Sequence, residues 1–137
     1  MGLMTQDQYV ESLRDGRVIF WDGDKITDPP SHPNFRVPIE VAKGDYDYDN
    51  PEKRDIITYE TEDGELAHRV FQVPRTEADL QARIKLAHNM SMVGGVTGVY
   101  MALLSIKDEV AQVNPRYAEN IEAMYRYARA NDLRGAE

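Results

Sequence analysis

Residues 88–105, His-Asn-Met-Ser-Met-Val-Gly-Gly-Val-Thr-Gly-Val-Tyr-Met-Ala-Leu-Leu-Ser, form the least polar stretch of an otherwise strongly charged chain. The stretch contains no Lys, Arg, Asp or Glu, and Gly94, Gly95 and Gly98 fall within five of its residues. Each glycine inside a helix costs about 1 kcal/mol relative to alanine. We therefore predict that one helix ends near Val93 and that a second covers residues 99–110, with a glycine-rich turn between them.

The glycine-rich turn has two interpretations. Glycines allow either a neighbouring helix or a flat ligand to approach the backbone closely. The residues alone favour a tight crossing of two core helices over the wall of a ligand cavity. Tyr100 is the only phenol in the stretch, and a buried phenol needs a hydrogen-bond partner. It is therefore either a core residue or a donor to a ligand, while His88 has the pattern of a hydrogen-bonded core histidine.

Composition narrows the class of protein. The 137 residues are enough for one domain with a hydrophobic core. A net charge of -8 argues against partners such as nucleic acid or an anionic membrane surface. The absence of cysteine excludes disulfides, thiolate nucleophiles and cysteine-ligated metals. With no evident signal peptide and no long apolar run, the sequence predicts a soluble, cytoplasmic protein.

Local signals predict a mainly α fold with two small β-hairpins. Four helix starts carry a capping residue or an N-cap followed by proline: Thr5-Gln-Asp-Gln8, Asn50-Pro51, Thr76-Glu-Ala-Asp79 and Asn114-Pro115. Strands at residues 18–21 and 24–26 flank the Asp22-Gly23 turn, which is typical of a two-residue hairpin. A second hairpin is predicted from residues 57–59 and 67–71, on either side of Glu62-Asp-Gly-Glu65.

Several further expectations concern burial. We expect a helix over residues 37–43, a solvated acidic loop over residues 45–49 rather than a calcium site, and a half-exposed His68 on a strand. Leu80, Ile84, Ala87 and Ser91 recur at helical spacing and predict one face of a helix. The last helix should carry an apolar stripe and fray near residues 131–135; the stripe comprises Tyr117, Ile121, Met124, Tyr125 and Ala128.

No pattern of catalytic or metal-binding residues is evident. His32, His68 and His88 are far apart and form no zinc-type pair, so no metal site is predicted. His32 lies among prolines in a turn, where a structural hydrogen bond is the expected role. The sequence also lacks a phosphate-binding loop and a dinucleotide fingerprint. From the residues alone, the conclusion is a helical soluble domain with a glycine-flanked apolar pocket.

The order of motifs along the chain resembles a known family. The motifs that carry the resemblance are Met4-Thr-Gln-Asp-Gln-Tyr-Val-Glu-Ser-Leu-Arg-Asp-Gly-Arg17, Trp21-Asp-Gly23, His32-Pro-Asn-Phe-Arg36, Pro51-Glu-Lys-Arg-Asp-Ile-Ile-Thr-Tyr59, Phe71-Gln-Val-Pro-Arg-Thr-Glu-Ala-Asp-Leu80 and Tyr117-Ala-Glu-Asn-Ile-Glu-Ala-Met-Tyr-Arg-Tyr-Ala-Arg-Ala-Asn-Asp-Leu133. Together they resemble the N-terminal domain of the 4-hydroxyphenylacetate 3-hydroxylase large-component family. That family also includes 4-hydroxybutyryl-CoA dehydratase and vinylacetyl-CoA isomerase.

The resemblance implies a fold and a cofactor. The family fold is like that of acyl-CoA dehydrogenases, and residues 1–137 would form its single N-terminal helical domain. The middle β-domain and the C-terminal helical domain are absent from the chain, which would be a split-gene subunit or an excised domain. The implied cofactor is reduced FAD, supplied by a separate flavin reductase and held mainly by a partner chain that carries the other domains.

The resemblance also implies site residues. The hydroxylases have Arg-Ser/Thr-Pro-Asp-Tyr where this chain has Val96-Thr-Gly-Val-Tyr100, and their Arg and Tyr hold the phenol oxygen. Tyr100 is thus the candidate catalytic residue, with Val96, Thr97 and His88 as candidate substrate-binding residues. Because Val96 replaces the Arg, the fixed cation for a phenolate is lost at that position. Met90 and Gly94 stand where the dehydratase needs cysteines, which excludes its iron–sulfur chemistry here.

Three functions remain as hypotheses. In the first, the chain is the N-terminal subunit or fragment of a reduced-flavin-dependent monooxygenase of small aromatic substrates. In the second, it is a non-catalytic assembly subunit with Tyr100 in its core. In the third, it belongs to a redox-neutral flavin enzyme acting on an acyl-CoA. We further expect a stable hetero-oligomer with two or more copies of each chain, because one domain of this size cannot bury all the apolar residues around the turn.

Overall fold

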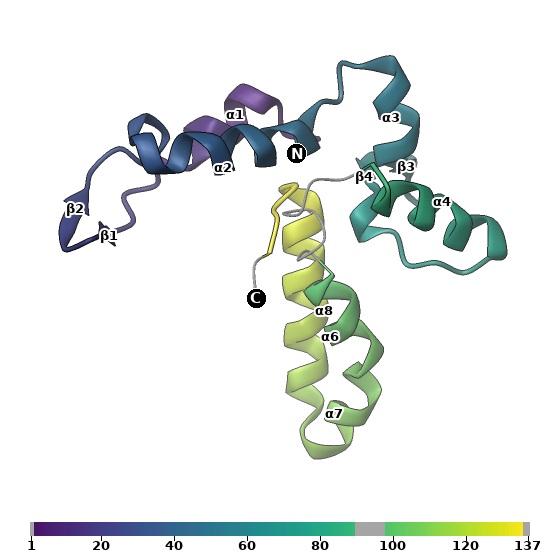
Figure 1. The fold of residues 1–137 in the computed structure, drawn as a ribbon. Coiled ribbons are helices and arrows are strands. Elements are labelled where there is room, and N and C mark those ends of the chain that lie inside the picture. The colour runs from purple at the N-terminus through teal and green to yellow at the C-terminus, as the bar shows by residue number, and fades with distance from the viewer. Residues whose placement is uncertain (1, 90–97, 136–137) are drawn as a thin grey trace.

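A computed structural model describes residues 2–89 and 98–135. Figure 1 shows three groups of elements that spread from a common junction. The first group contains α1, the β1–β2 hairpin and α2; the second contains α3, the β3–β4 hairpin and α4; the third contains α6, α7 and α8. The fold is mainly helical with two small antiparallel hairpins, so the predicted fold class is confirmed.

The first group begins with the predicted capping box. In α1 (Gln6–Ser12), the Thr5 hydroxyl accepts from the Gln8 backbone N–H, and the Gln8 side chain accepts from the Thr5 N–H. Strands β1 (Ile19–Trp21) and β2 (Asp24–Ile26) pair in the predicted register across the Asp22-Gly23 turn. Both turn residues have positive φ, 51° and 88°, as a two-residue hairpin of this twist requires.

Helix α2 (Pro33–Lys43) begins four residues earlier than predicted. Its first residue is a proline, which loses no hydrogen bond at that position. His32 caps the helix because its Nδ1 accepts from the Asn34 N–H at 3.3 Å. Pro29 and Pro30 form a short 3-10 turn (Pro29–Ser31) and Pro33 starts α2, so the expected structural hydrogen bond of His32 is confirmed at a helix start.

The acidic segment at residues 45–49 is largely buried, so the expectation of a solvated loop was wrong. Residues Gly44–Tyr46 form a short 3-10 turn, and Asp45, Tyr46 and Tyr48 are 4%, 3% and 8% exposed. The Tyr46 ring stacks on Tyr9 with centroids 4.6 Å apart. Asp45 and both tyrosines are therefore buried, and the two tyrosines belong to the hydrophobic core.

The second group packs a short helix against a hairpin. Helix α3 (Pro51–Ile57) starts at the predicted Asn50 cap and includes Ile57, which was predicted to begin the next strand. Strands β3 (Thr58–Glu60) and β4 (Leu66–His68) pair antiparallel, and a 3-10 turn (Arg69–Phe71) replaces the end of the predicted strand. His68 is 1% exposed, so the prediction of a half-exposed histidine was wrong.

Helix α4 (Glu77–Ala87) has the predicted capping box but presents a different face to the core. Leu80 and Ile84 are 53% and 59% exposed, whereas Leu86 is 3% exposed. Helical spacing therefore identified an apolar stripe that the described residues do not cover. The helix ends at Ala87, before the predicted end near Val93, which lies outside the described residues.

The capping box of α4 leads to a first prediction. Replacing Thr76 by alanine removes the hydroxyl that accepts from the Asp79 N–H, and should lower the free energy of unfolding by about 1 kcal/mol. Thr27→Ala is the matched control, because Thr27 is exposed and lies outside any helix; its effect should stay within about 0.5 kcal/mol. Urea denaturation measures both. Equal effects of the two variants would contradict a capping role for Thr76.

The third group is a helical hairpin. Where one helix was predicted, the chain forms α6 (Val99–Ser105) and α7 (Lys107–Val113), interrupted at Ile106. Helix α8 (Pro115–Ala130) then runs back along both from its Asn114 cap. The prediction of a stripe on α8 was only partly right: Ala128 is buried, but Tyr117 and Met124 are 51% and 41% exposed.

The hydrophobic core lies where the three groups meet. Its members come from the second and third groups and from the segment between α2 and α3, and they are Tyr46, Tyr48, Ile57, Val70, Phe71, Leu86, Tyr100 and Ala128. Phe71 is completely buried and its ring contacts Tyr100 and Tyr125, with centroids 5.7 and 6.3 Å away. The core thus joins elements that are distant in sequence. Among the described residues, no helix is long and apolar enough to cross a membrane.

Candidate functional site

Tyr100 lies in the first turn of α6, close to the junction of the three groups of elements. Its side chain belongs to the core and is 9% exposed. The ring meets Phe71 at a tilt of 37°. Burial raises the pKa of the Tyr100 phenol, and the nearby charge of Arg134 acts in the opposite direction. At neutral pH the phenol is therefore protonated and able to donate a hydrogen bond.

The C-terminal segment at residues 131–135 packs against Tyr100. A Cβ atom built on Gly135 would lie 3.4 Å from Cε2 and Cζ of the Tyr100 ring and 3.1 Å from Cγ1 of Val99. A side chain at this position would therefore be in van der Waals contact with the phenol ring and would press on the Val99 side chain. The segment forms part of the surroundings of Tyr100.

This segment does not fray, contrary to the prediction. The Leu133 N–H donates to the Ala128 carbonyl and the Asp132 N–H donates to the Arg129 carbonyl, at 2.9 and 3.3 Å. Asp132 adopts φ 52°. These two bonds and the left-handed residue form a Schellman motif, which closes α8 and turns the chain back toward the core.

A buried ion pair anchors the same segment. Arg134 donates from Nη1 to Asp132 Oδ1 at 2.7 Å, and the two side chains are 4% and 2% exposed. Asp132 Oδ2 accepts from the Tyr48 hydroxyl at 2.8 Å and from the Met4 N–H at 3.0 Å. We call Met4, Tyr46, Tyr48, Asp132 and Arg134 the buried clasp, because they join both ends of the chain to the 3-10 turn before α3.

The remaining contacts of Arg134 are with aromatic residues and backbone. Its Nη2 donates to the Tyr48 hydroxyl at 3.1 Å, and its guanidinium lies 4.5 Å from the centroid of the Tyr46 ring. Burial alone would lower the pKa of Arg134, but Tyr48 and Asp132 raise it above its ordinary value. The guanidinium is therefore a permanent charge inside the core.

Next to the clasp, His68 is buried beside Tyr48, with ring centroids 6.0 Å apart. Its Nδ1 accepts from the Val70 N–H at 3.1 Å, and its Nε2 has no partner among the described residues. Burial and the charges of Arg134 and Arg69 hold the pKa of His68 well below its ordinary value. His68 is accordingly neutral in the folded chain.

The pKa of His68 predicts acid sensitivity. Above pH ~6.5 the imidazole is neutral in both the folded and unfolded chain and contributes no pH dependence. Below that pH the unfolded chain binds the proton first, so stability should fall by up to about 1.4 kcal/mol per pH unit. Urea denaturation between pH 7 and pH 5 measures this slope.

The variants His68→Asn and His88→Asn separate this effect from other titrations. Asparagine at position 68 can still accept from the Val70 N–H, and the slope between pH 7 and pH 5 should flatten. His88→Asn changes an exposed histidine and should keep the slope of the unmodified chain. An unchanged slope in His68→Asn would show that His68 is not the source.

Of the other residues proposed from the sequence, only His88 lies within the described part of the chain. His88 is exposed at the end of α4, where its Nδ1 lies 2.8 Å from the Ile84 carbonyl oxygen. It is therefore not the core histidine that the sequence favoured. Val96 and Thr97 lie outside the described residues. Asp132 and Arg134 were missed, although an Asn-Asp pair after a long helix is compatible with a left-handed helix end.

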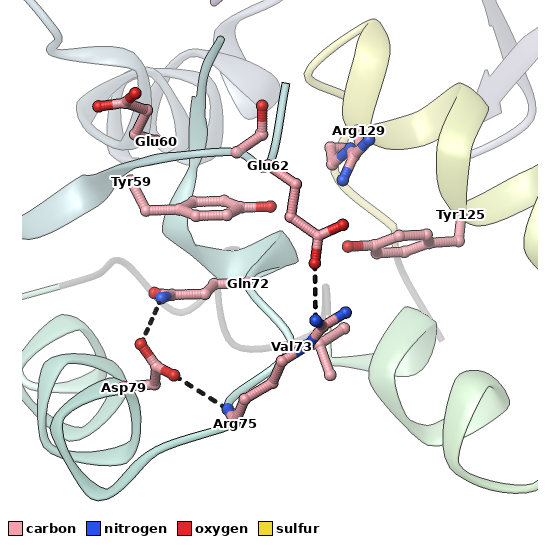
Figure 2. A pocket seen from close by; sticks show the side chains of 10 residues that line it. Tyr59, Glu60, Glu62, Gln72, Val73, Arg75, Asp79, Tyr125 and Arg129 are labelled. Atoms are coloured by element: carbon pink, nitrogen blue, oxygen red, sulfur yellow. Dashed lines mark hydrogen bonds and ion pairs between the residues drawn. The ribbon is translucent and has the colours of Figure 1, made fainter. Parts of the chain in front are cut away.

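A separate open pocket of about 260 Å³ lies between β3, the start of α4 and α8. Figure 2 shows the Tyr59 and Tyr125 hydroxyls directed toward one another, with the Glu62 side chain between them. Glu62 pairs with Arg75 at 2.7 Å, and Tyr125 donates to the Phe71 carbonyl at 2.5 Å. Burial raises the pKa of Tyr59 to about 12, helped by Tyr125.

The described residues hold no cluster of three or more metal-binding side chains. At the start of each long helix, the residue before the helix already accepts from one N–H group of the first turn. His32 caps α2, Thr76 caps α4 and Asn114 caps α8. The described part of the chain therefore offers a buried phenol and a buried cation, but no evident cradle for a pyrophosphate.

Comparison with known proteins identifies relatives of the whole chain. The 4-hydroxyphenylacetate 3-monooxygenase oxygenase component of Thermus thermophilus is 31% identical over 136 residues, which are 94% of this chain and 28% of that protein. The crystal structure of an oxygenase component of 4-hydroxyphenylacetate 3-monooxygenase, complexed with FAD and 4-hydroxyphenylacetate, superimposes with a TM-score of 0.79 at 30% identity. That match covers 95% of this chain and 29% of the solved one.

A more distant structure shares the fold alone. It is an archaeal 4-hydroxybutyryl-CoA dehydratase from N. maritimus, with a TM-score of 0.65 and 20% identity over 91% of this chain and 28% of that one. The chain thus spans between a quarter and a third of the length of these relatives. The family model described as 4-hydroxyphenylacetate 3-hydroxylase N terminal matches residues 5–137. The chain therefore belongs to the 4-hydroxyphenylacetate 3-hydroxylase family and corresponds to its N-terminal region.

Proposed function

We propose that the chain is the N-terminal part of a reduced-FAD-dependent monooxygenase of small aromatic compounds. The observation that carries this proposal is the match of residues 5–137 to the family's N-terminal model, together with the fold shared with an oxygenase component complexed with FAD and 4-hydroxyphenylacetate. A separate flavin reductase supplies the reduced flavin. When bound, reduced FAD provides the electrons that activate dioxygen for insertion into the ring.

The remaining regions of the enzyme, on this polypeptide or on a second chain, complete the fold. The chain exposes 9143 Å² of surface. A compact monomer of its mass, 15.7 kDa, would expose about 7,300 Å². The excess is consistent with the open arrangement in Figure 1. It is also of the size that a permanent domain or subunit interface covers.

Apolar side chains lie where such an interface would form. Met101 and Leu104 of α6 line an apolar groove of about 360 Å³ with Val73, Pro74, Arg83 and Ser105. Val113 and Tyr127, on α7 and α8, are 81% and 65% exposed. We infer that the middle and C-terminal domains cover these helices in a stable hetero-oligomer or a longer chain.

FAD is held mainly by those other regions. The starts of α2, α4 and α8 are closed by their own caps, and Arg134 is committed to Asp132 and Tyr48. Arg83 donates to the carbonyls of Val70 and Gln72. Arg134 and Arg83 are thus already hydrogen-bonded within the chain and are not free to hold a pyrophosphate.

The isolated chain is therefore expected to bind FAD weakly, with a dissociation constant above the micromolar range. Titration of FAD with the chain, followed by flavin fluorescence, measures this. Addition of the polypeptide that carries the middle and C-terminal domains should bring binding into the micromolar range or tighter. Micromolar binding by the chain alone would contradict the proposed division of the flavin site.

Tyr100 is the group through which this chain contributes to the substrate site. Its phenol is protonated at neutral pH and donates a hydrogen bond to the substrate oxygen, with His88, Val96 and Thr97 on the same wall in the completed enzyme. The rival function is that of a non-catalytic assembly subunit. It is favoured by the burial of Tyr100 between Phe71 and Gly135, which is what a core residue would show.

Turnover in a reconstituted system tests the proposal. The components are the chain, the polypeptide carrying the remaining domains, a flavin reductase with NADH and FAD, and a panel of para-substituted phenols. Formation of the corresponding catechol, lost when this chain alone is omitted, is the expected result. Equal product formation without the chain would contradict the proposal.

A further inference from the structure

The C-terminal segment at residues 132–135 connects the buried clasp to Tyr100. Asp132 and Arg134 belong to the buried clasp, and Gly135 follows directly. The clasp leaves this segment little freedom, because Asp132 accepts from Met4 and Tyr48 as well as from Arg134. The Schellman bonds from Asp132 and Leu133 fix the other end of the segment to α8.

Gly135, the last residue of this segment, lies next to Tyr100. The backbone of Gly135 lies against one edge of the phenol ring, within the distance that a single added methyl would fill. Phe71, which is 0% exposed, lies against the same ring at a centroid distance of 5.7 Å. The ring is thus packed between a core residue that cannot move easily and a backbone segment that the clasp anchors.

We propose that the buried Asp132–Arg134 pair is a positioning element for Tyr100, acting through the close contact between Gly135 and the phenol ring. In this arrangement the ring orientation is set by the far end of the chain and not by α6 alone. Because the Arg134 side chain is 4% exposed and paired with Asp132, it acts through the position of the ring. Its second effect is electrostatic, because its charge opposes the rise that burial causes in the pKa of Tyr100.

The role in positioning is independent of activity, although its consequence for catalysis rests on the proposed function. If Tyr100 donates to the substrate, a shift of its ring alters the rate of the chemical step more than substrate binding. The test is therefore made on the environment of Tyr100 itself, and its outcome does not depend on whether the enzyme is a monooxygenase.

A fluorinated tyrosine at position 100 of the full chain reports both effects. Its phenol ionises closer to neutral pH than that of tyrosine, so the titration avoids alkaline unfolding. The ¹⁹F signal is recorded across this titration for the parent protein and for Gly135→Ala, Arg134→Lys and Arg134→Met. Glu62→Gln, which breaks an exposed ion pair, is the matched control.

Each variant has a distinct expected result. Gly135→Ala should move the ¹⁹F shift, because its methyl would meet the ring at 3.4 Å and Val99 at 3.1 Å, while the clasp charge is kept. Arg134→Met should raise the midpoint of the titration, because a cation that favours the phenolate is lost. Arg134→Lys keeps the charge and should restore the midpoint at least partly. Glu62→Gln should leave both readouts unchanged.

The proposal is overturned if Gly135→Ala shows the parent ¹⁹F shift, or if Arg134→Met shows both the parent shift and the parent midpoint. It is also overturned if Glu62→Gln changes the signal as much as the Arg134 variants do. If Arg134→Met does not fold, the decision rests on Arg134→Lys and Gly135→Ala, which keep a cation and an intact ion pair, respectively. In the reconstituted enzyme, Gly135→Ala should then lower kcat several-fold with little change in KM.

Discussion

Replacing Asp132 by alanine should lower the free energy of unfolding by about 3–5 kcal/mol, the range for breaking a buried ion pair from one side. The substitution leaves the Arg134 guanidinium buried with no carboxylate, and it removes the acceptor for Met4 and Tyr48. Leaving buried donors without partners adds to the cost. Urea denaturation followed by circular dichroism measures the loss. Partial unfolding of the variant at room temperature would also agree with the prediction.

The matched control is Glu62→Ala, which breaks the ion pair with Arg75. Its side chains are 78% and 72% exposed, so the change should be at most about 1 kcal/mol. Comparing the two variants distinguishes the effect of breaking a buried ion pair from the effect of breaking an exposed one. Equal losses in the two variants, or a loss below about 1 kcal/mol for Asp132→Ala, would show that the clasp does not stabilise the fold as described.

Tyr100→Phe should lower turnover by about 10²–10³-fold in the reconstituted enzyme, the usual loss when one hydrogen-bond donor to a developing charge is removed. Phenylalanine keeps the ring that packs on Phe71 and Gly135, so the fold should be retained. The measurement is catechol formation under saturating phenol, with FAD binding as a check of assembly. Tyr117→Phe is the control, because Tyr117 is 51% exposed on α8.

A loss confined to Tyr100→Phe would support the hydrogen-bond role. Unchanged turnover in Tyr100→Phe, with unchanged folding, would assign Tyr100 to the core and favour the assembly function. A loss of FAD binding in Tyr100→Phe would instead indicate that the ring stabilises the interface with the remaining domains. The three outcomes are distinguished by measuring turnover, folding and flavin binding on the same preparations.

Local sequence signals predicted the parts of the fold that depend on neighbouring residues. The caps at Thr5, Asn50, Thr76 and Asn114 all form as predicted, because a side chain and an N–H two or three residues away decide them. The Asp22-Gly23 hairpin is also local, since its positive φ angles favour those two residue types.

Features that depend on distant contacts were not predictable in this way. The helical spacing of Leu80 and Ile84 is real, but nothing in α4 itself determines which face the rest of the fold covers. The acidic segment with Tyr46 and Tyr48 is buried against Arg134, whose guanidinium lies over the Tyr46 ring and donates to the Tyr48 hydroxyl. A single sequence does not reveal such a pairing between residues more than eighty positions apart.

The candidate site was predictable only through resemblance. Tyr100 was singled out as the one phenol of the apolar stretch and by its place in the family's motif. Its covering by Gly135 and the nearby charge of Arg134 required the fold, because they come from a segment expected to fray. The placement of Val96 and Thr97, outside the described residues, stays a prediction.

The central claim is that this chain is part of an enzyme that inserts oxygen into an aromatic substrate. The most direct test is a reaction of the complete system with 4-hydroxyphenylacetate and reduced FAD under ¹⁸O₂, followed by mass spectrometry of the product. We predict that one ¹⁸O atom enters each product molecule, the second leaves as water, and the flavin ends oxidised. Unlabelled product, or labelled product formed equally well without this chain, would contradict the account.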